Sequence, residues 1–253
     1  MRAKLIIANW KLNGNWSFNE EYASAFSNGL KDVDVTGRQI VICPPSIYLQ
    51  QLNGLILNQE IYFGGQDLSD EISGAFTGEV SGVMLKEFGC RYVLVGHSER
   101  RVRHQETNEI VVKKALNALA AGLRPVICVG ETLEQRQAQQ MHEVLFSQVD
   151  AILQGLGERV DEIVLAYEPI WAIGTGQTAS AEQAQEVHGW LRETIGKTSR
   201  SIGENLPMIY GGSVKSDNAA QLLEMPDIDG LLVGGSSLVV SEFLSICQAG
   251  NVI

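Results

Sequence analysis

The stretch IVLAYEP, residues 163–169, contains the pattern from which the fold of this chain can be worked out. Five apolar residues are followed directly by a carboxylate, Glu168, and then by Pro169. A short, uninterrupted apolar run is typical of a strand buried on both faces, as in a parallel sheet. Proline ends a central strand because it has no N–H to donate. We therefore predict a buried parallel strand over residues 163–167 that ends on an acid.

Runs of the same kind recur along the whole chain. Including the first, they cover residues 5–8, 40–43, 61–64, 92–95, 125–129, 163–167, 207–210 and 228–233. Most are rich in β-branched residues and do not alternate with polar ones, which again favours strands that are buried on both faces.

Helical patterns separate these runs. Apolar positions recur at spacings of three and four in three segments: Met141, Val144, Leu145, Val149 and Ile152; Ala184, Val187, Leu191 and Thr194; and Val112, Leu116 and Leu119. Capping boxes that begin at Thr132 and Ser180 predict the starts of two helices. Gly122 and Gly155 are predicted to end helices.

Eight strand–helix units in 253 residues predict an α/β fold, a single-domain (β/α)8 barrel over residues 1–253. No low-complexity linker divides the chain. The alternative is an open doubly wound sheet, which usually carries GxGxxG after its first strand. Here NWKLNG follows that strand, and Gly174-Thr175-Gly176 lacks the lysine of a phosphate-binding P-loop, so both absences favour the barrel.

The composition argues against several classes of partner. The net charge of −11 disfavours a nucleic-acid-binding protein, and no apolar run approaches the roughly 18 residues of a membrane span. The cysteines lack CxxC spacing and form no ligand motif with the histidines, so we expect reduced thiols, no metal and a cytoplasmic protein. An anionic substrate would have to be held by local cations and backbone N–H groups.

Polar residues stand where the predicted strands end, which is the face that carries the active site in parallel α/β folds. Taken by itself, Lys11 is more simply interpreted as an ordinary solvated lysine, and His97 as a structural histidine. Glu168 is a stronger candidate for a functional residue, because a partly desolvated carboxylate should have a raised pKa that suits a general base. Glycine turns at 211–213 and 234–236 follow the last two strands, where barrels commonly bind phosphate. Together these residues predict proton transfer beside a carbonyl in a phosphorylated substrate.

Seven motifs along the chain resemble those of the triosephosphate isomerases. They are NWKLNG (9–14), SGAFTGEVS (73–81), VGHSERR (95–101), VICVGE (126–131), AYEPIWAIGTG (166–176), YGGSVK (210–215) and LVGG (232–235). The resemblance covers essentially the whole chain, and VGHSER and YEPIWAIGTG are its most specific parts. Leu12, Ser236 and Val239 depart from the family pattern, which commonly has Met, Ala and Lys there, and none of the three is a proposed catalytic group.

The resemblance implies interconversion of dihydroxyacetone phosphate and D-glyceraldehyde 3-phosphate without a metal or organic cofactor. Glu168 would take a proton from substrate carbon, and neutral His97 would move protons between the two oxygens. Lys11 would stabilise the enediolate, and Asn9 would orient it. Backbone N–H groups to the phosphate are implied for Gly174, Ser213, Gly234 and Gly235, with supporting positions at Ser98, Glu99 and Cys128.

The resemblance also gives roles to two loops. Residues 169–176 would form a lid that closes over the phosphate. The loop 66–80 is long and carries the apolar residues Ile72, Ala75 and Phe76, which either fold back on their own barrel or pack elsewhere. The resemblance implies a homodimer through this loop, with Thr77 close to Asn9 and Lys11 of the partner subunit.

Two other functions remain possible from the sequence. Another phosphate-binding barrel enzyme, such as a sugar-phosphate lyase or synthase, would share the glycine turns but has no need of VGHSER together with YEPIW. A non-catalytic binding or adhesion barrel would tolerate the loss of Lys11, His97 or Glu168, and all three are present.

Overall fold

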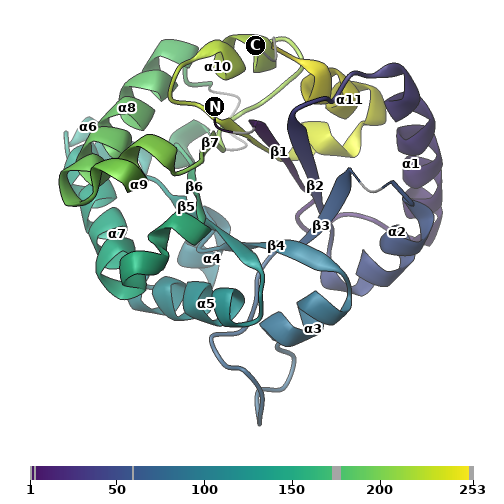
Figure 1. The fold of residues 1–253 in the computed structure, drawn as a ribbon, viewed down its shortest axis with the longest axis horizontal. Helices are drawn as coiled ribbons and strands as arrows, with labels where there is room; N and C mark the ends of the chain where they lie inside the picture. Colours follow the sequence, from purple (N-terminus) through teal and green to yellow (C-terminus); the bar gives the residue numbers. More distant parts are fainter. Residues whose placement is uncertain (1, 3, 59, 173–177, 251–253) are drawn as a thin grey trace.

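The computed structural model describes residues 2, 4–58, 60–172 and 178–250, and within them eight strands form one closed barrel (Figure 1). Each strand pairs in parallel with its neighbours in sequence, and β8 pairs with β1 to close the ring. The strands are β1 Lys4–Asn9, β2 Arg38–Cys43, β3 Ile61–Gly65, β4 Cys90–Val95, β5 Arg124–Val129, β6 Val164–Tyr167, β7 Met208–Tyr210 and β8 Gly230–Val233. All eight predicted strands are confirmed, with ends that differ by one or two residues.

Helices form a ring around the strands (Figure 1). The α-helices are α1 Trp16–Gly29, α2 Leu49–Leu55, α3 Gly82–Glu87, α4 Ser98–Arg103, α5 Asn108–Ala120, α6 Leu133–Gln137, α7 Met141–Leu156, α8 Ala181–Thr198, α9 Arg200–Asn205, α10 Ala219–Glu224 and α11 Val240–Gln248. Short 3-10 helices are η1 Leu30–Asp32, η2 Ser46–Tyr48, η3 Gly157–Glu162, η4 Ile170–Ala172 and η5 Gly235–Leu238. No helix in the described part of the chain is both long and apolar enough to cross a membrane.

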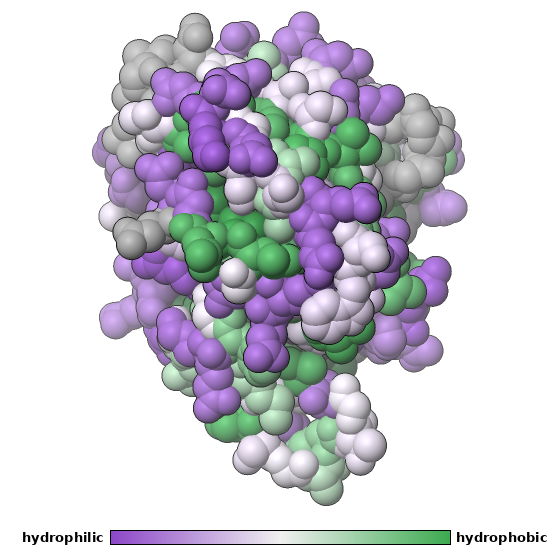
Figure 2. All heavy atoms as spheres, turned by 90° about the vertical axis from the view of Figure 1, so that its right-hand side faces the viewer, coloured by the Kyte–Doolittle hydropathy of each residue, from purple (hydrophilic) through white to green (hydrophobic). Residues whose placement is uncertain are grey.

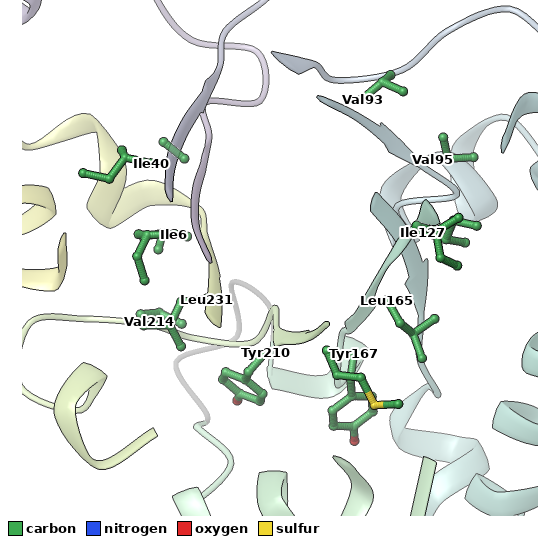
Figure 3. Packing of buried hydrophobic residues seen from close by; sticks show 14 of the residues in the cluster. Ile6, Ile40, Val93, Val95, Ile127, Leu165, Tyr167, Tyr210, Val214 and Leu231 are labelled. Carbon is green, nitrogen blue, oxygen red and sulfur yellow. The ribbon is translucent and has the colours of Figure 1, made fainter. Parts of the chain in front are cut away.

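The strands separate two apolar layers. Successive side chains of a strand point to opposite faces, so Ile7, Val41 and Leu94 fill the inside of the barrel. Their neighbours Ile6 and Ile40 pack outward against the helices, and Figure 3 shows this outer layer around the ring of strands. Burial on both faces explains why the sequence shows continuous apolar runs instead of alternation.

Local signals set most helix ends as predicted. Thr132 and Ser180 both form complete capping boxes, and Gly122, with φ of 73°, follows the end of α5. The prediction that Gly155 ends a helix was wrong, because α7 continues to Leu156 and Gly157, with φ of 57°, follows it. A Cβ on Gly155 would lie 2.3 Å from Cγ1 of Val112, so this glycine lets α5 and α7 pack closely.

The buried face of α5 agrees with the prediction only in part. Leu119 is buried as predicted, but Val112 and Leu116 are only half-buried, and Val111, Ala115 and Ala118 are buried in their place. The cause is tertiary: Val112 faces α7 at Gly155 instead of the strands. The faces predicted for α7 and α8 are buried largely as expected, through Leu145, Val149 and Ile152 on α7 and the four predicted residues of α8.

The imidazole of His188 lies fully inside the layer between strands and helices. His188 on α8 has no exposed surface, and its ring packs edge-on against Tyr167 with centroids 5.8 Å apart. Its Nδ1 lies 3.2 Å from the carbonyl of Asp227, while Nε2 has no hydrogen-bond partner among the described residues. Burial lowers the pKa of His188 to about 4, so the ring is neutral in the folded protein at neutral pH.

This buried imidazole should make folding stability fall with acid. Between the ordinary pKa near 6.5 and the folded pKa of about 4, the unfolded chain binds a proton that the folded chain does not. Asparagine at this position keeps an N–H near Nδ1 but does not titrate there. Between pH 7 and pH 4.5 the free energy of unfolding should therefore fall in both proteins. We expect the fall to be roughly 2.5 kcal/mol smaller in His188→Asn than in the wild type. Urea unfolding at both pH values measures this, and parallel losses in the two proteins would contradict it.

Candidate active site

A cavity of about 250 Å³ opens at the carboxyl ends of the strands. It is lined by Asn9 at the end of β1, Lys11 after β1, His97 after β4, Glu168 after β6, and the glycine turns after β7 and β8. The turns contribute Ser213, Gly234, Gly235 and Ser236. The structure thus brings together residues from five separate strands, as their positions at the strand ends predict. Gly174 and the second half of the expected lid, residues 173–176, lie outside the described residues.

Glu168 and His97 are in direct contact in this cavity. Oε1 of Glu168 lies 2.9 Å from Nε2 of His97, and Oε2 accepts a hydrogen bond of 3.0 Å from the backbone N–H of Ser98. Glu168 is only 2% exposed, so both carboxylate oxygens are held by protein groups instead of water. The thiol of Cys128 adjoins the same carboxylate, and burial together with Glu168 raises the pKa of that thiol well above its ordinary value, which keeps it protonated.

The charge state of Glu168 differs from the expectation. Burial alone raises its pKa, as we predicted from the sequence. However, His97, the Ser98 N–H and Lys11 favour the carboxylate by more, so the net pKa of Glu168 lies below its ordinary value. The prediction of a raised pKa was therefore wrong, because the sequence did not show that both oxygens would have partners. A base that is already ionised at neutral pH is ready to accept a proton.

The histidine ring is held from its other side by backbone. The N–H of Glu99, in the first turn of α4, donates to Nδ1 of His97 at 3.2 Å. Because Nδ1 accepts, the neutral ring carries its proton on Nε2, which donates to Glu168. Burial lowers the pKa of His97, but the Glu168 carboxylate raises it by more, so the net pKa lies above its ordinary value while this pair is intact.

Lys11 brings a cation to the same cavity. Its ammonium lies 2.7 Å from Oε1 of Glu99, and its backbone N–H donates to Oδ1 of Asn9 at 3.1 Å. The backbone of Lys11 has φ of 53°, a left-handed conformation that is uncommon outside glycine. Gln66, at the base of the long loop, donates to the carbonyl of Lys11 at 2.9 Å. These contacts fix Lys11 although its side chain is partly open to solvent.

Glycine is required in the turn after β7, which packs against Glu168 and Tyr210. A Cβ on Gly211 would lie 2.9 Å from Cγ of Glu168, and one on Gly212 would lie 2.1 Å from the Tyr210 hydroxyl oxygen. By contrast, a Cβ on Gly235 would meet nothing within 4 Å, so this turn faces open space. Small residues therefore leave the backbone accessible to a ligand, as a phosphate site needs.

Ser236, one of the departures from the family pattern, connects these two turns. Its hydroxyl donates to the carbonyl of Val214 at 2.8 Å, which joins the turn after β8 to the turn after β7. Val239, another departure, is 52% exposed. The structure therefore gives Ser236 a local role and gives Val239 none that we can identify.

Sequence reasoning missed the importance of Glu131. This residue follows β5, is fully buried, and through Oε1 contacts three groups. These are Tyr167 Oη at 3.1 Å, Trp171 Nε1 at 2.9 Å and Arg136 Nη1 at 2.8 Å. Arg136 also lies over the Trp171 ring, 4.9 Å from its centroid. Glu131 thus anchors the chain just beyond Glu168. The only sequence signal was an acid two residues beyond the end of a predicted strand.

Comparison with known proteins agrees with this geometry. A family model described as triosephosphate isomerase matches residues 4–250. The triosephosphate isomerase of Albidiferax ferrireducens is 50% identical over 246 residues, which cover 97% of this chain and 98% of that protein. Those of Herminiimonas arsenicoxydans and Cupriavidus necator are each 49% identical, over 98% of this chain and their own full length. No group of three or more potential metal ligands occurs among the residues described here.

The Ser236 bridge can be tested through the turns that it joins. Removing the hydroxyl leaves the Val214 carbonyl without this donor, and such a hydrogen bond contributes about 0.5–1.5 kcal/mol. We expect Ser236→Ala to weaken the binding of inorganic phosphate in the cavity about threefold to tenfold. The NMR amide signals of Ser213 and Gly235, recorded during a phosphate titration, measure this affinity. Ser245→Ala, which removes a hydroxyl bonded only within α11, is the control. Unchanged affinity in Ser236→Ala would show that the bridge does not position the turns.

Proposed function

Since the chain belongs to the triosephosphate isomerase family, we propose that Glu168, His97 and Lys11 carry out its reaction through an enediolate intermediate. That reaction is the interconversion of dihydroxyacetone phosphate and D-glyceraldehyde 3-phosphate, a step of glycolysis. The observation that carries the assignment of roles is the cavity itself. It sets a carboxylate, an imidazole and an ammonium beside two glycine turns.

In this proposal Glu168 is the general base. Its carboxylate takes the proton from the carbon that bears the hydroxyl group, and the electron pair of that C–H bond forms the enediolate double bond. The carbonyl π electrons move to oxygen at the same time. Glu168, now protonated, returns the proton to the neighbouring carbon, so the enzyme ends in its starting state. Its lowered pKa supports this role, since the ionised form is populated at neutral pH.

His97 is proposed to move the proton between the two substrate oxygens. For this, its Nε2–H has to leave Glu168, to which it is now bonded at 2.9 Å, and face the substrate. Separation also removes the nearby carboxylate that raises the pKa of His97. The Glu99 N–H remains on Nδ1, and a cation would have to give up that bond. Both effects favour the neutral imidazole in the substrate complex.

Lys11 and Asn9 are proposed to bind the negative charge that develops on oxygen. Lys11 is fixed by Glu99 and by its own backbone contacts, so little reorganisation is needed when charge appears. Ser213, Gly234 and Gly235 are proposed to hold the phosphate through backbone N–H groups, with Gly174 contributing from the lid. Ser98, Glu99 and Cys128 are proposed as supporting residues because each adjoins Glu168 or Lys11.

The two alternatives from the sequence are less well supported. A lyase or synthase barrel would not be expected to match the isomerase family from residue 4 to residue 250. A non-catalytic barrel would have no reason to keep Glu168 buried and paired with His97. A coupled isomerase assay on the purified protein tests the activity directly, and absence of turnover would overturn it.

We also propose that the protein is a homodimer. The loop between β3 and α3 projects beyond the body of the barrel (Figures 1 and 2). Its apolar residues do not fold back on the barrel: Ile72 is 61% exposed and Phe76 is 45% exposed. Further exposed apolar side chains, Leu12, Trp16 and Ile47, follow β1 and β2, and β2 is a neighbour of β3 in the barrel. Several exposed apolar side chains at this end of the barrel support a protein–protein interface.

The base of this loop links the proposed interface to the catalytic cavity. Asp67 pairs with Lys114 at 2.8 Å and with Arg100 at 2.8 Å, and Gln66 holds the Lys11 carbonyl. A second subunit packed on the loop would therefore support the position of Lys11. Buried, free thiols at all four cysteines support our proposal that the protein works in the cytoplasm.

Shortening the proposed base should affect the chemical step. Glu168→Asp keeps the charge but withdraws the carboxylate by about one C–C bond, and general-base catalysis is commonly worth about 10²–10⁴-fold. We expect kcat to fall at least about 10²-fold with KM little changed. Glu186→Asp on the exposed face of α8 is the control. A near-normal kcat in Glu168→Asp would remove this residue from the role of base.

A charge in the exposed loop should separate the proposed dimer. Thr77 is exposed in the single chain, and arginine there would bury an unpaired cation between subunits. We expect Thr77→Arg to sediment as a monomer and to lose most of its activity, although every catalytic residue is intact. Thr198→Arg adds the same charge at the end of α8. A wild-type protein that is monomeric and fully active at micromolar concentration would contradict the dimer.

A further inference from the structure

A second polar cavity, of about 380 Å³, lies at the opposite mouth of the barrel, where the strands begin. Three cationic side chains line it: Lys86 on α3, Arg91 at the second position of β4, and Arg124 at the first position of β5. We call it the basal pocket. It shares no lining residue with the catalytic cavity. Figure 1 shows α3 and α5 on either side of β4, in the part of the barrel where this pocket lies.

The basal pocket is positive in a chain whose net charge is −11. Glu162 is the one carboxylate among its lining residues, and it already forms an ion pair with a residue outside the pocket. Its two oxygens lie 2.6 and 3.1 Å from the guanidinium of Arg159. None of the three lining cations forms an ion pair with a carboxylate in the described part of the chain. The pocket therefore keeps an excess of positive charge.

Most hydrogen-bond donors of these cations are unused within the protein. Lys86 donates to the carbonyl of Gly122 at 2.8 Å, which leaves two of its three donors. Arg124 donates from Nη2 to the carbonyl of Ile163 at 3.2 Å, while its Nε is buried without a hydrogen-bond partner among the described residues. A buried, unpaired donor is costly unless a ligand or water satisfies it.

The pocket is also fixed in shape. The guanidinium of Arg91 lies 4.4 Å from the centroid of the Tyr62 ring, which holds it by a cation–π contact. Tyr92 and Arg124 are register partners on β4 and β5, and the Tyr92 hydroxyl donates to Gln39. Two guanidinium groups on neighbouring strands are thus held in place, and a guanidinium matches the oxygens of phosphate or carboxylate in pairs.

Helix capping explains only one of the three cations. Lys86 contacts Gly122, just beyond the end of α5, where a cation is favourable. Arg91 makes no hydrogen bond to backbone in the described residues, and Arg124 begins a strand. Helix capping therefore does not explain why Arg91 and Arg124 converge on the same cavity.

We propose that the basal pocket binds a small oxyanion with at least two negative charges, of the phosphate or polycarboxylate class, separately from the isomerase site. The guanidinium groups of Arg91 and Arg124 each bind two oxygens of the anion, and Lys86 adds a third positive contact. A volume of 380 Å³ is within the range of small-molecule sites and excludes large polyanions from full entry. Binding there does not depend on the isomerase activity or on the roles proposed for its residues.

The test titrates the full-length protein with inorganic pyrophosphate and, separately, with citrate. NMR follows the Nε–H signal of Arg124 for the basal pocket and the Ser213 amide for the catalytic cavity, so the two sites are read independently. We expect the Arg124 signal to shift and saturate with at least one probe. The more tightly bound probe identifies a phosphate or a carboxylate ligand. Absence of a saturable shift with both probes would overturn the proposal.

Variants then assign the contacts. We expect Arg91→Gln combined with Arg124→Gln to weaken binding in the pocket at least tenfold, measured by calorimetry, with KM and kcat of the isomerase unchanged. The affinity of Arg124→Lys for the anion should lie between that of this double variant and that of the wild type, because lysine keeps the charge but loses the paired donors of the guanidinium. Lys197→Gln combined with Arg200→Gln removes the same charge from exposed helix positions and is the control. Equal affinity in the double pocket variant and this control would refute the site.

Discussion

Closure of eight parallel strands into one ring is the constraint on which the rest of this molecule depends. A closed sheet has no free edge, and every strand must be buried on both faces. Closure also requires close approach between particular backbones. A Cβ on Gly230 would lie 1.9 Å from the carbonyl oxygen of Leu5, where β8 meets β1. A Cβ on Gly130 would lie 1.8 Å from the carbonyl oxygen of Glu168. Glycine at these points lets the ring close and positions the strand that ends beside Glu168.

Because all strands run the same way, the ring gathers their carboxyl ends at one mouth and their amino ends at the other. At the first mouth a buried carboxylate, Glu168, is stable because its partners are fixed by the same scaffold. The Ser98 N–H belongs to the start of α4, and His97 is held in turn by the Glu99 N–H. A desolvated charge with these partners stays ionised, whereas an unpartnered one would be neutral. The electrostatics of the site therefore follow from the barrel geometry.

The sequence predicted those features that depend on local pattern and could not predict those that depend on distant contacts. Eight strands, two capping boxes and the residues at the strand ends are visible in short windows of sequence. The misplaced helix end at Gly155 has a different cause, since a glycine needed for packing against Val112 looks the same as a glycine that ends a helix. The lowered pKa of Glu168 and the anchoring contacts of Glu131 involve groups far apart in the chain. Only the fold brings those partners together.

An acidic chain that acts on anions must also concentrate its positive charge locally. The long-range field of a protein with net charge −11 repels a phosphorylated substrate, and salt screens that repulsion beyond about 8–10 Å. Close contacts then decide binding. Lys11 stands at the catalytic mouth, with part of its charge balanced by Glu99, which is itself half-exposed. A substrate phosphate that approaches Lys11 therefore meets both an attractive ammonium and a repulsive carboxylate. In the phosphate binding that we propose, backbone N–H groups of the glycine turns add attraction without adding a titratable charge, so their contribution is the same at any pH near neutrality.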